Sequence, residues 1–387
     1  MRSRPARHAL AVALLVSAVN ALAGQVLDGQ SLAGQGPAPA QAPADLDRIK
    51  AAAERGEAES QYRLGVRYAT GDGVTTDDAQ AARWIEKAAA QGHVGAQFDL
   101  GLMYADGNGV PQDSRIAVEW LRKAADQGDA RAMSNLGLMY ANGSGVPMDD
   151  VQAFDWYRKA ALLNEITAQF TVGLMYAQGA GVAADPAQAV SWFEKAAGRG
   201  HTLAQYNLGL AYTRGSGVPR DAAKAAQWFR SAAEQGDAQA QFTLGTMYAN
   251  GAGVARDEAQ AVVWYRRAAQ NGLAVAQTNL GARYAAGRGT AEDPVEAARW
   301  FERAARQGDA SALFNLGVLY ANGTGVAQDA VRAYVLLALA AAKATGSEAA
   351  RYGGARDTVA AALTPEQLTE AQALARQGAI PWPALAP

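Results

Sequence analysis

The sequence has no cysteine at all and only three histidines among its 387 residues. The absence of cysteine excludes a disulfide framework, thiol catalysis and a cysteine-ligated metal site. It is also typical of an oxidising compartment, where unpaired thiols are a liability. Beyond the N-terminal segment only His93 and His201 remain; they lie far apart and each follows a glycine, so we expect turn residues, with no metal and no cofactor.

An excess of charge of one sign is also missing. Lysine and arginine number 35 against 37 acidic residues, a net charge of −2. Loss of Arg2, Arg4 and Arg7 by N-terminal processing would leave 32 basic residues against 37 acidic, about −5. Nucleic acid is therefore not an expected partner. Half of the residues are apolar and 19% are charged, which excludes a generally disordered chain.

Motifs of catalysis are absent too. We find no His-Glu-x-x-His, no Gly-x-Ser-x-Gly, and no Gly-x-Gly turn followed by Gly-Lys-Ser/Thr. The best-placed carboxylates are aspartates that a helix-capping role explains, although paired acids for glycoside cleavage stay open as an alternative. We predict no catalytic residues and a chain that is not an enzyme.

The N-terminal segment has the composition of an export signal. Three arginines precede an apolar run from Ala9 to about Val19, and Ala21-Leu22-Ala23 provides a small-x-small cleavage site. We predict a signal peptide over 1–23, with an uncleaved anchor as the alternative, and a flexible linker over 24–44. The mature protein is then periplasmic or secreted and has no transmembrane span.

What the sequence does contain is a repeat of 36 residues. Glycine recurs at that interval in eight copies, and tyrosine follows three residues after each glycine. Seven copies also have tryptophan at one further position, and the eighth has Leu336 there. The glycines are Gly65, Gly101, Gly137, Gly173, Gly209, Gly245, Gly281 and Gly317, and the tryptophans are Trp84, Trp120, Trp156, Trp192, Trp228, Trp264 and Trp300.

Each copy predicts two antiparallel helices. In the second copy Ala96, Leu100 and Tyr104 share one helix face, and a turn of two glycines and a proline ends that helix. Asp113 then caps the next helix, and in five copies Gln or Glu three residues after the aspartate predicts a capping box. Gly101 interrupts the first helix at a cost of about 1 kcal/mol relative to alanine. A close neighbouring backbone or the tryptophan ring would compensate for it.

The motif A-x-x-x-L-G-x-x-Y-x-x-G-x-G-V-x-x-D, followed by A-x-x-W and A-A-x-x-G, resembles the Sel-one-like repeat, a relative of the tetratricopeptide repeat. The resemblance covers roughly residues 45–376. It implies an all-α, right-handed superhelical solenoid of 36-residue antiparallel helix pairs that holds proteins together. Some members of the family are cysteine-rich and are labelled β-lactamases, but the paired cysteines are absent here.

The expected layout follows from this register. A half repeat covers 45–59 and eight repeats cover 60–347. Capping helices at 348–378 close the open end of the solenoid, and a loose tail covers 379–387.

One stripe of the first helices is the predicted partner-binding surface. Positions two before, two after and five after each helix glycine share a face, and such first helices line the concave wall in tetratricopeptide-like superhelices. Asparagine can bond both N–H and C=O groups of an extended peptide, and methionine adapts to varied surfaces. The predicted residues are Asp99, Met103, Asp106, Asn135, Met139, Asn142, Thr171, Met175, Gln178, Asn207, Arg214, Met247, Asn250, Asn279, Arg283, Asn315 and Asn322.

Several alternatives stay open. The methionines of this first-helix stripe could instead fill the core. A row of cations on the second helices, Lys87 to Arg303, is a solvated face, with a phosphate site as the alternative. The leading function is an exported protein- or peptide-binding scaffold; the others are a cell-envelope hydrolase acting on a β-lactam or peptidoglycan, and a self-associating structural part.

One junction between repeats is irregular. Leu162-Leu163-Asn164 stands where other copies have residues such as Asp126-Gln127-Gly128. Asparagine tolerates the left-handed conformation that glycine adopts there. Leu162 or Ile166 either fills a gap between helices, or the leucines form an apolar patch for a partner or for a second copy of the chain.

Overall fold

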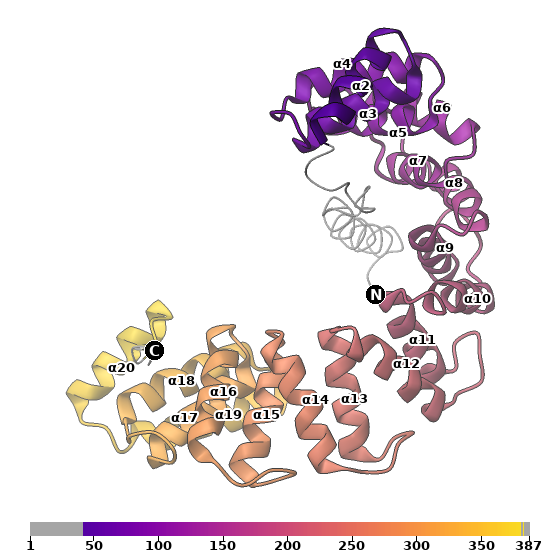
Figure 1. The fold of residues 1–387 in the computed structure, drawn as a ribbon. Helices are drawn as coiled ribbons and strands as arrows, with labels where there is room; N and C mark the ends of the chain where they lie inside the picture. The colour runs from indigo at the N-terminus through magenta and orange to yellow at the C-terminus, as the bar shows by residue number, and fades with distance from the viewer. Residues whose placement is uncertain (1–41, 381, 383–387) are drawn as a thin grey trace. The chain divides into compact units, whose positions relative to one another are not determined.

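The structure, a computed structural model, describes residues 42–380 and 382 (Figure 1). The predicted signal peptide, nearly all of the linker and the last five residues lie outside this part. The described residues form nineteen α-helices and no strand. The helices are α2 (Ala42–Glu54), α3 (Ala58–Thr70), α4 (Asp78–Ala90), α5 (Val94–Asp106), α6 (Ser114–Asp126), α7 (Ala130–Asn142), α8 (Asp150–Leu162), α9 (Ile166–Gln178), α10 (Pro186–Ala197), α11 (Thr202–Arg214), α12 (Ala222–Glu234), α13 (Ala238–Asn250), α14 (Glu258–Gln270), α15 (Ala274–Ala286), α16 (Pro294–Arg306), α17 (Ala310–Asn322), α18 (Ala330–Lys343), α19 (Gly346–Ala360) and α20 (Pro365–Gln377).

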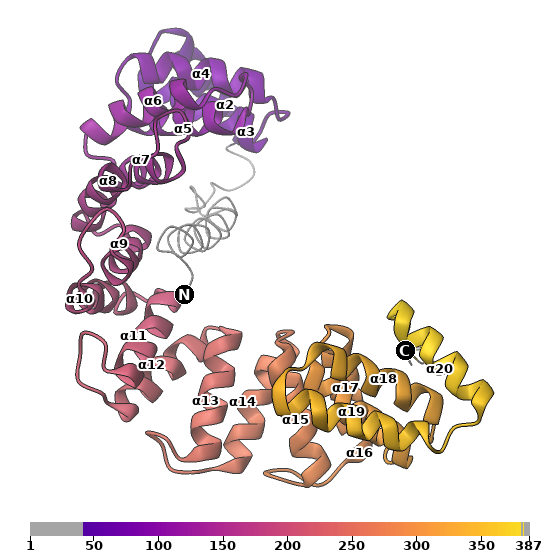
Figure 2. The ribbon, with the colours of Figure 1, turned by 180° about the vertical axis from the view of Figure 1, so that it is seen from behind.

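The chain divides into two compact units, Met1–His201 and Thr202–Pro387. Within each unit the helices from α2 to α19 each pack against the next one along the chain, first as a pair inside a repeat and then across to the following repeat, whereas α20 packs against α18. Figures 1 and 2 show this stepwise order in both units. The prediction of an all-α solenoid built from 36-residue helix pairs is confirmed.

Aspartate starts the second helix of every repeat, as predicted. Asp113 has extended backbone and its carboxylate accepts from the N–H groups of Arg115 and Ile116. The reciprocal side-chain bond of a capping box, however, forms within the described residues only between Thr364 and Gln367 of α20. The predicted boxes in the repeats are therefore wrong: these helices rely on the aspartate alone.

Two glycines with positive φ make the turn inside each repeat. Gly107 ends α5 with φ 80°, and its N–H bonds the carbonyl of Met103. At Gly109 a Cβ atom would lie 2.0 Å from the carbonyl oxygen of Asp78 in the preceding repeat. This second glycine is thus required both by its conformation and by the packing of successive repeats.

The helix glycine makes room for the residue that follows the tryptophan. A Cβ on Gly101 would lie 2.7 Å from Cγ of Leu121, and one on Gly209 would lie 2.6 Å from the ring of Phe229. The carbonyl of Ala189 lies 3.2 Å from the corresponding point on Gly173. The expected close backbone is present, but the tryptophan ring was the wrong choice of side chain.

The two ends of the described chain cover apolar surface. At the start, Leu46 and Ile49 of α2 are buried against Leu64. At the other end, α19 inserts Tyr352, which is fully buried and stacks on Phe314 at 4.4 Å between ring centroids. Beyond α20, Trp382 packs against a hydrophobic cluster of the last two repeats, beneath the guanidinium of Arg306 in α16. Of the predicted tail at 379–387, Ile380 and Trp382 make these contacts, and residues 381 and 383–387 lie outside the described part.

Candidate partner-binding surface

The three positions of the first-helix stripe differ in exposure. Five residues after the helix glycine, Asp106, Asn142, Gln178, Arg214, Asn250 and Asn322 are exposed at the helix end. Two residues before the glycine, Asp99, Asn135, Asn207, Asn279 and Asn315 are half-buried, whereas Thr171 is 1% exposed. The outer end of the stripe is thus available to a partner in every repeat, and the inner end in most of them.

Most methionines of the stripe belong to the core. Met139, Met175 and Met247 are 7%, 1% and 8% exposed and lie in the hydrophobic clusters of their units. Met103 is only half-buried. The alternative that these methionines fill gaps therefore describes three of the four.

The asparagines of the stripe are anchored on their own helices. Nδ2 of Asn135 donates to the carbonyl of Arg131 at 2.9 Å, and Asn207 and Asn279 make the same bond four residues back at 2.8 Å. An asparagine amide has two N–H donors and an acceptor oxygen. No other described residue bonds the second donor or the oxygen of these three amides. Each one is held in place with hydrogen-bonding capacity to spare.

Asp99 lies in a small polar cluster where repeats meet. The hydroxyl of Tyr62 donates to its carboxylate at 2.8 Å. Burial raises the pKa of Asp99, while the bond from Tyr62 and the charge of Arg131 oppose the shift. Arg131 itself pairs with Asp129 at 2.8 Å and covers the ring of Phe98. The cluster satisfies its own charges, so Asp99 is partly committed to holding neighbouring repeats together.

Arg283 is also engaged in a contact within the chain. Its guanidinium forms an ion pair with Glu258, which Arg256 contacts as well at 2.7 Å. The hydrogen bond from Arg256, with the nearby arginines, lowers the pKa of this carboxyl. Arg283 differs in this from the exposed Arg214, which remains the cation of the stripe best placed for a partner.

A row of buried glutamines was missed in the sequence. Nε2 of Gln97 donates to the carbonyl of Ala89 at 3.1 Å, and its Oε1 accepts from Gln127 at 2.7 Å, 30 residues further on. The same amide pairs join Gln61 to Gln91, Gln205 to Gln235, Gln241 to Asn271 and Gln277 to Gln307. Glutamine at a fixed place in the 36-residue period was the available signal.

Comparisons with known proteins agree with this architecture. A family model of the Sel1 repeat matches eight successive segments, 58–93, 94–129, 130–165, 166–201, 202–237, 238–273, 274–309 and 310–344. The chain belongs to the Sel1 repeat family. Sel1 repeat proteins are generally non-enzymatic scaffolds of tetratricopeptide-like repeats that typically mediate protein–protein interaction.

Two solved Sel1-type structures are similar over most of the chain. A Sel1 repeat protein from Oxalobacter formigenes is 34% identical, with 82% of this chain and 90% of that chain covered and a TM-score of 0.63. A protective antigen of uropathogenic Escherichia coli is 32% identical, with 86% of each chain covered and a TM-score of 0.47. No curated protein matches the chain.

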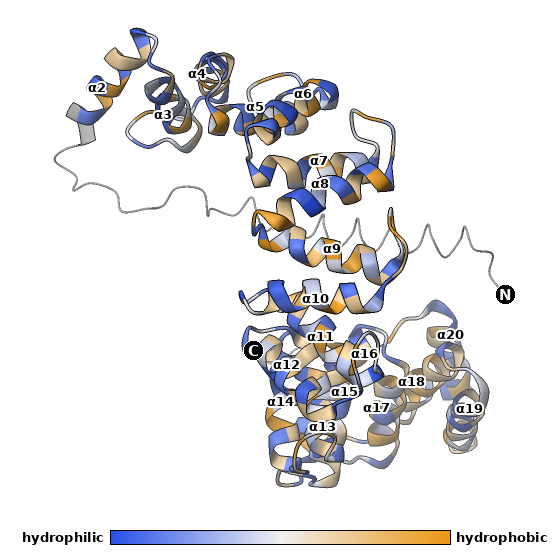
Figure 3. Cartoon of the chain, turned by 90° about the vertical axis from the view of Figure 1, so that its right-hand side faces the viewer, coloured by the Kyte–Doolittle hydropathy of each residue, from blue (hydrophilic) through white to orange (hydrophobic). Residues whose placement is uncertain are grey.

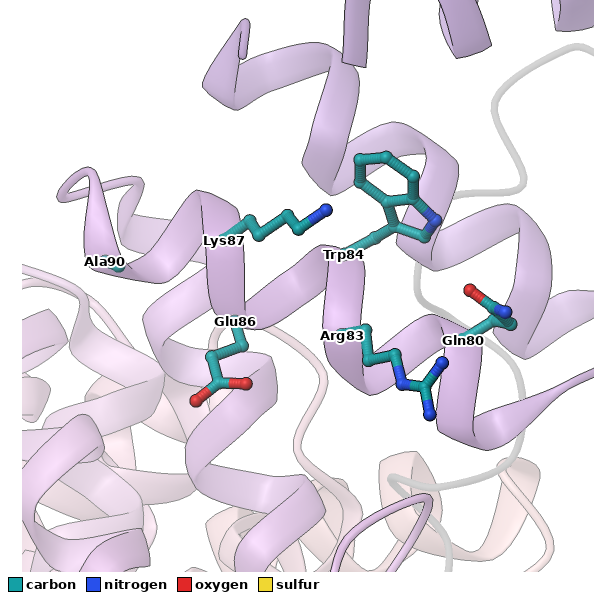
Figure 4. A pocket seen from close by; sticks show the side chains of 6 residues that line it. All are labelled: Gln80, Arg83, Trp84, Glu86, Lys87 and Ala90. Atoms are coloured by element: carbon teal, nitrogen blue, oxygen red, sulfur yellow. The ribbon is translucent and has the colours of Figure 1, made fainter. Parts of the chain in front are cut away.

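The cations on the second Sel1 helices cover the tryptophan rings. Nζ of Lys87, Lys123, Lys159 and Lys195 lies 3.6–4.0 Å from the indole centroid three residues earlier, and Arg267 and Arg303 lie at 4.5 Å. Figure 4 shows Lys87 reaching toward Trp84. Such contacts are worth about 0.5–1 kcal/mol at exposed sites. The row of cations therefore has a role inside six of the eight repeats.

The depression in Figure 4 has a volume of about 510 Å³ and is lined by Gln80, Arg83, Trp84, Glu86, Lys87 and Ala90. All six belong to α4, so no group from a second element converges on it. A site for a small ligand needs convergent polar groups in an enclosed space. This depression is a gap between side chains of one helix.

Within the described residues no helix is long and apolar enough to cross a membrane. Figure 3 shows polar and apolar residues interleaved along the helices. In the same part of the chain, no three histidine or acidic side chains come together in a way that could hold a metal ion.

Proposed function

We propose that this Sel1 repeat protein is an exported scaffold that binds an extended segment of a partner protein along its first-helix stripe. The observation that carries the proposal is the anchoring of the stripe asparagines. Because each amide is already fixed by a bond to its own helix, little side-chain freedom is lost when a partner binds. The remaining oxygen and N–H suit the backbone of an extended peptide.

The C-terminal unit offers the most regular arrangement of this kind. Asn207, Thr243 and Asn279 occupy one position in three successive repeats, and all three are half-buried. Each bonds the carbonyl four residues earlier in its helix. Arg214 and Asn250 are exposed at the ends of the same helices. We expect the inner row to bond the partner's backbone and the outer residues to select its side chains.

The export part of the proposal has separate support. It rests on the basic, apolar and small-residue pattern of residues 1–23 and on the absence of cysteine. Fractionation of cells that produce the protein, with N-terminal sequencing of the exported form, tests it. An N-terminus at residue 24 in an envelope or culture fraction is expected, and a cytoplasmic protein that keeps residues 1–23 would refute it.

The binding part can be tested with random peptides. The chain is used to select binders from a phage-displayed peptide library, and the selected peptides are then titrated by calorimetry. The double variant Asn207→Ala/Asn279→Ala removes two side chains that would each form a hydrogen bond of about 0.5–1.5 kcal/mol with the bound peptide. Binding should weaken about tenfold or more, with an unchanged melting temperature.

Asn108→Ala is the matched control, because Asn108 is an exposed asparagine in the turn after α5. It should leave peptide binding unaltered. Peptides that bind the double variant as tightly as the unaltered chain would show that the stripe is not the binding surface. A double variant that loses several kcal/mol of stability would show that these asparagines serve the fold.

A further inference from the structure

Exposed apolar residues gather on one repeat of the N-terminal unit. Of the seven large hydrophobic residues that are exposed in the described chain, four lie between residues 148 and 163. Leu162 and Leu163 are 61% and 52% exposed, so Leu162 does not fill a gap between helices; Ile166 is half-buried. Met148 and Val151, at 67% and 56%, flank the start of the same helix, α8.

These residues belong to a stripe with an unusual order. Val151, Asp155, Arg158 and Leu162 follow one another at intervals of four, three and four residues, so they share one face of α8. All four are exposed. The stripe reads apolar, acidic, basic, apolar, and reversing its direction exchanges only the two charges.

We propose that two copies of the chain associate through this α8 stripe, with the two helices antiparallel about a twofold axis. Val151 of one copy then lies against Leu162 of the other, and Asp155 lies against Arg158, each pair occurring twice. A twofold contact requires a patch that complements itself. The α8 stripe meets that condition in both its apolar and its charged positions. This proposal goes beyond the scaffold function and does not depend on it.

The charges of the stripe support a second copy over an unrelated partner. Among the described residues, neither Asp155 nor Arg158 has an ion-pair partner, although both lie between apolar side chains. In the same positions of the neighbouring repeats the ends of the stripe are Arg115 and Asp126 on α6, or Ala187 of α10 and the Gly198 that follows this helix. Large apolar residues at both ends therefore distinguish α8.

The size of the patch sets the strength of the contact. One pair of short helices buries less surface than the 1,200–2,000 Å², roughly, of a stable interface. The association should be weak and reversible, and should appear only as the protein is concentrated. Sedimentation equilibrium of the full chain over a wide concentration range is the appropriate measurement.

Charge reversal tests the pairing itself. Asp155→Arg or Arg158→Asp alone places like charges opposite each other twice and should weaken self-association at least tenfold. The double variant Asp155→Arg/Arg158→Asp restores both pairs and should associate as the unaltered chain does. Mixing the two single variants should also restore association, because each supplies what the other lacks. Gln227→Arg, at the same position two repeats later, is the control and should change nothing.

Leu162→Ser tests the apolar part and should weaken self-association while leaving the melting temperature within the scatter of the controls. An unaltered chain that stays monomeric at the highest concentration would overturn the proposal. So would association that survives either single reversal, or one that neither the double variant nor the mixture restores while all variants keep their helicity. Those last results would mean that the chain self-associates through another face, or that the α8 stripe binds a different partner.

Discussion

The helix glycine provides the sharpest test of how the repeats pack. Gly209 of α11 lies against Phe229 of α12, which is 1% exposed. A Cβ at position 209 would lie 2.6, 2.7 and 2.8 Å from three ring atoms of Phe229. Carbon atoms pack best at about 3.5–4.0 Å. Gly209→Ala therefore requires the ring to move by about 1 Å in a region that is already filled.

The magnitude follows from two opposing effects. Alanine is better than glycine inside a helix by about 1 kcal/mol. Overpacking a core costs about 1–3 kcal/mol, and the upper part of that range applies because Phe229 is a large ring that is 1% exposed. We expect Gly209→Ala to destabilise the C-terminal unit by up to about 2 kcal/mol.

Gly353 is the matched control in the same unit. It lies inside α19, and no neighbouring heavy atom comes within 4 Å of the place its Cβ would take. Gly353→Ala should stabilise by about 0.5–1 kcal/mol. Urea denaturation followed by circular dichroism gives both values. If Gly209→Ala stabilised the chain as much as Gly353→Ala, the glycine would not be required by packing, and the explanation of the repeat's most regular residue would be wrong.

Three further predictions concern the N-terminal unit. Trp192→Ala truncates a ring that is 6% exposed and should cost about 3–5 kcal/mol locally, splitting thermal unfolding into separable transitions; a single transition at the original temperature would contradict it. The buried Oε1 of Gln169 has no hydrogen-bond partner, whereas Oε1 of Gln97, two repeats earlier, accepts from Gln127, whose equivalent here is Arg199. Arg199→Gln should therefore stabilise the chain by about 1 kcal/mol in denaturant titrations. A loss of stability would show that the contacts of Arg199 outweigh the missing bond. Burial lowers the pKa of His201 to about 4 from 6.5. As the pH falls below 6.5, the imidazole is therefore protonated in the unfolded chain but not yet in the folded chain. The free energy of unfolding should fall between pH 6.5 and pH 4 by up to about 3 kcal/mol. His201→Asn should flatten that part of the pH–stability curve, and an unchanged curve would mean that His201 does not cause the loss.

The parts of the fold that depend on local chemistry could be predicted from the sequence. The helix limits follow from aspartate caps and from glycines with positive φ, each of which acts within a few residues. The packing across repeats was harder to predict. Helical spacing placed Met139 on the same face of α7 as Asn135, but it could not show how far the next repeat covers that face. The choice of tryptophan as the neighbour of Gly101 failed for the same reason, since Leu121 lies one position further along the helix.

The leucine at position 163 of the irregular junction can be explained by the glutamine pairs, which were missed in the sequence. Leu163 occupies the position at which Gln91, Gln127 and Gln235 reach back to a glutamine 30 residues earlier. In its own repeat that earlier residue is Met133, which has no amide to satisfy, so a glutamine at 163 would have no buried partner to bond. The other repeat without the first glutamine has Leu313, and Lys343 stands 30 residues later. Loss of the earlier glutamine thus removes the reason for the later one. Position 163 is then free to carry an exposed leucine next to Leu162, directly after the helix whose outer stripe complements itself.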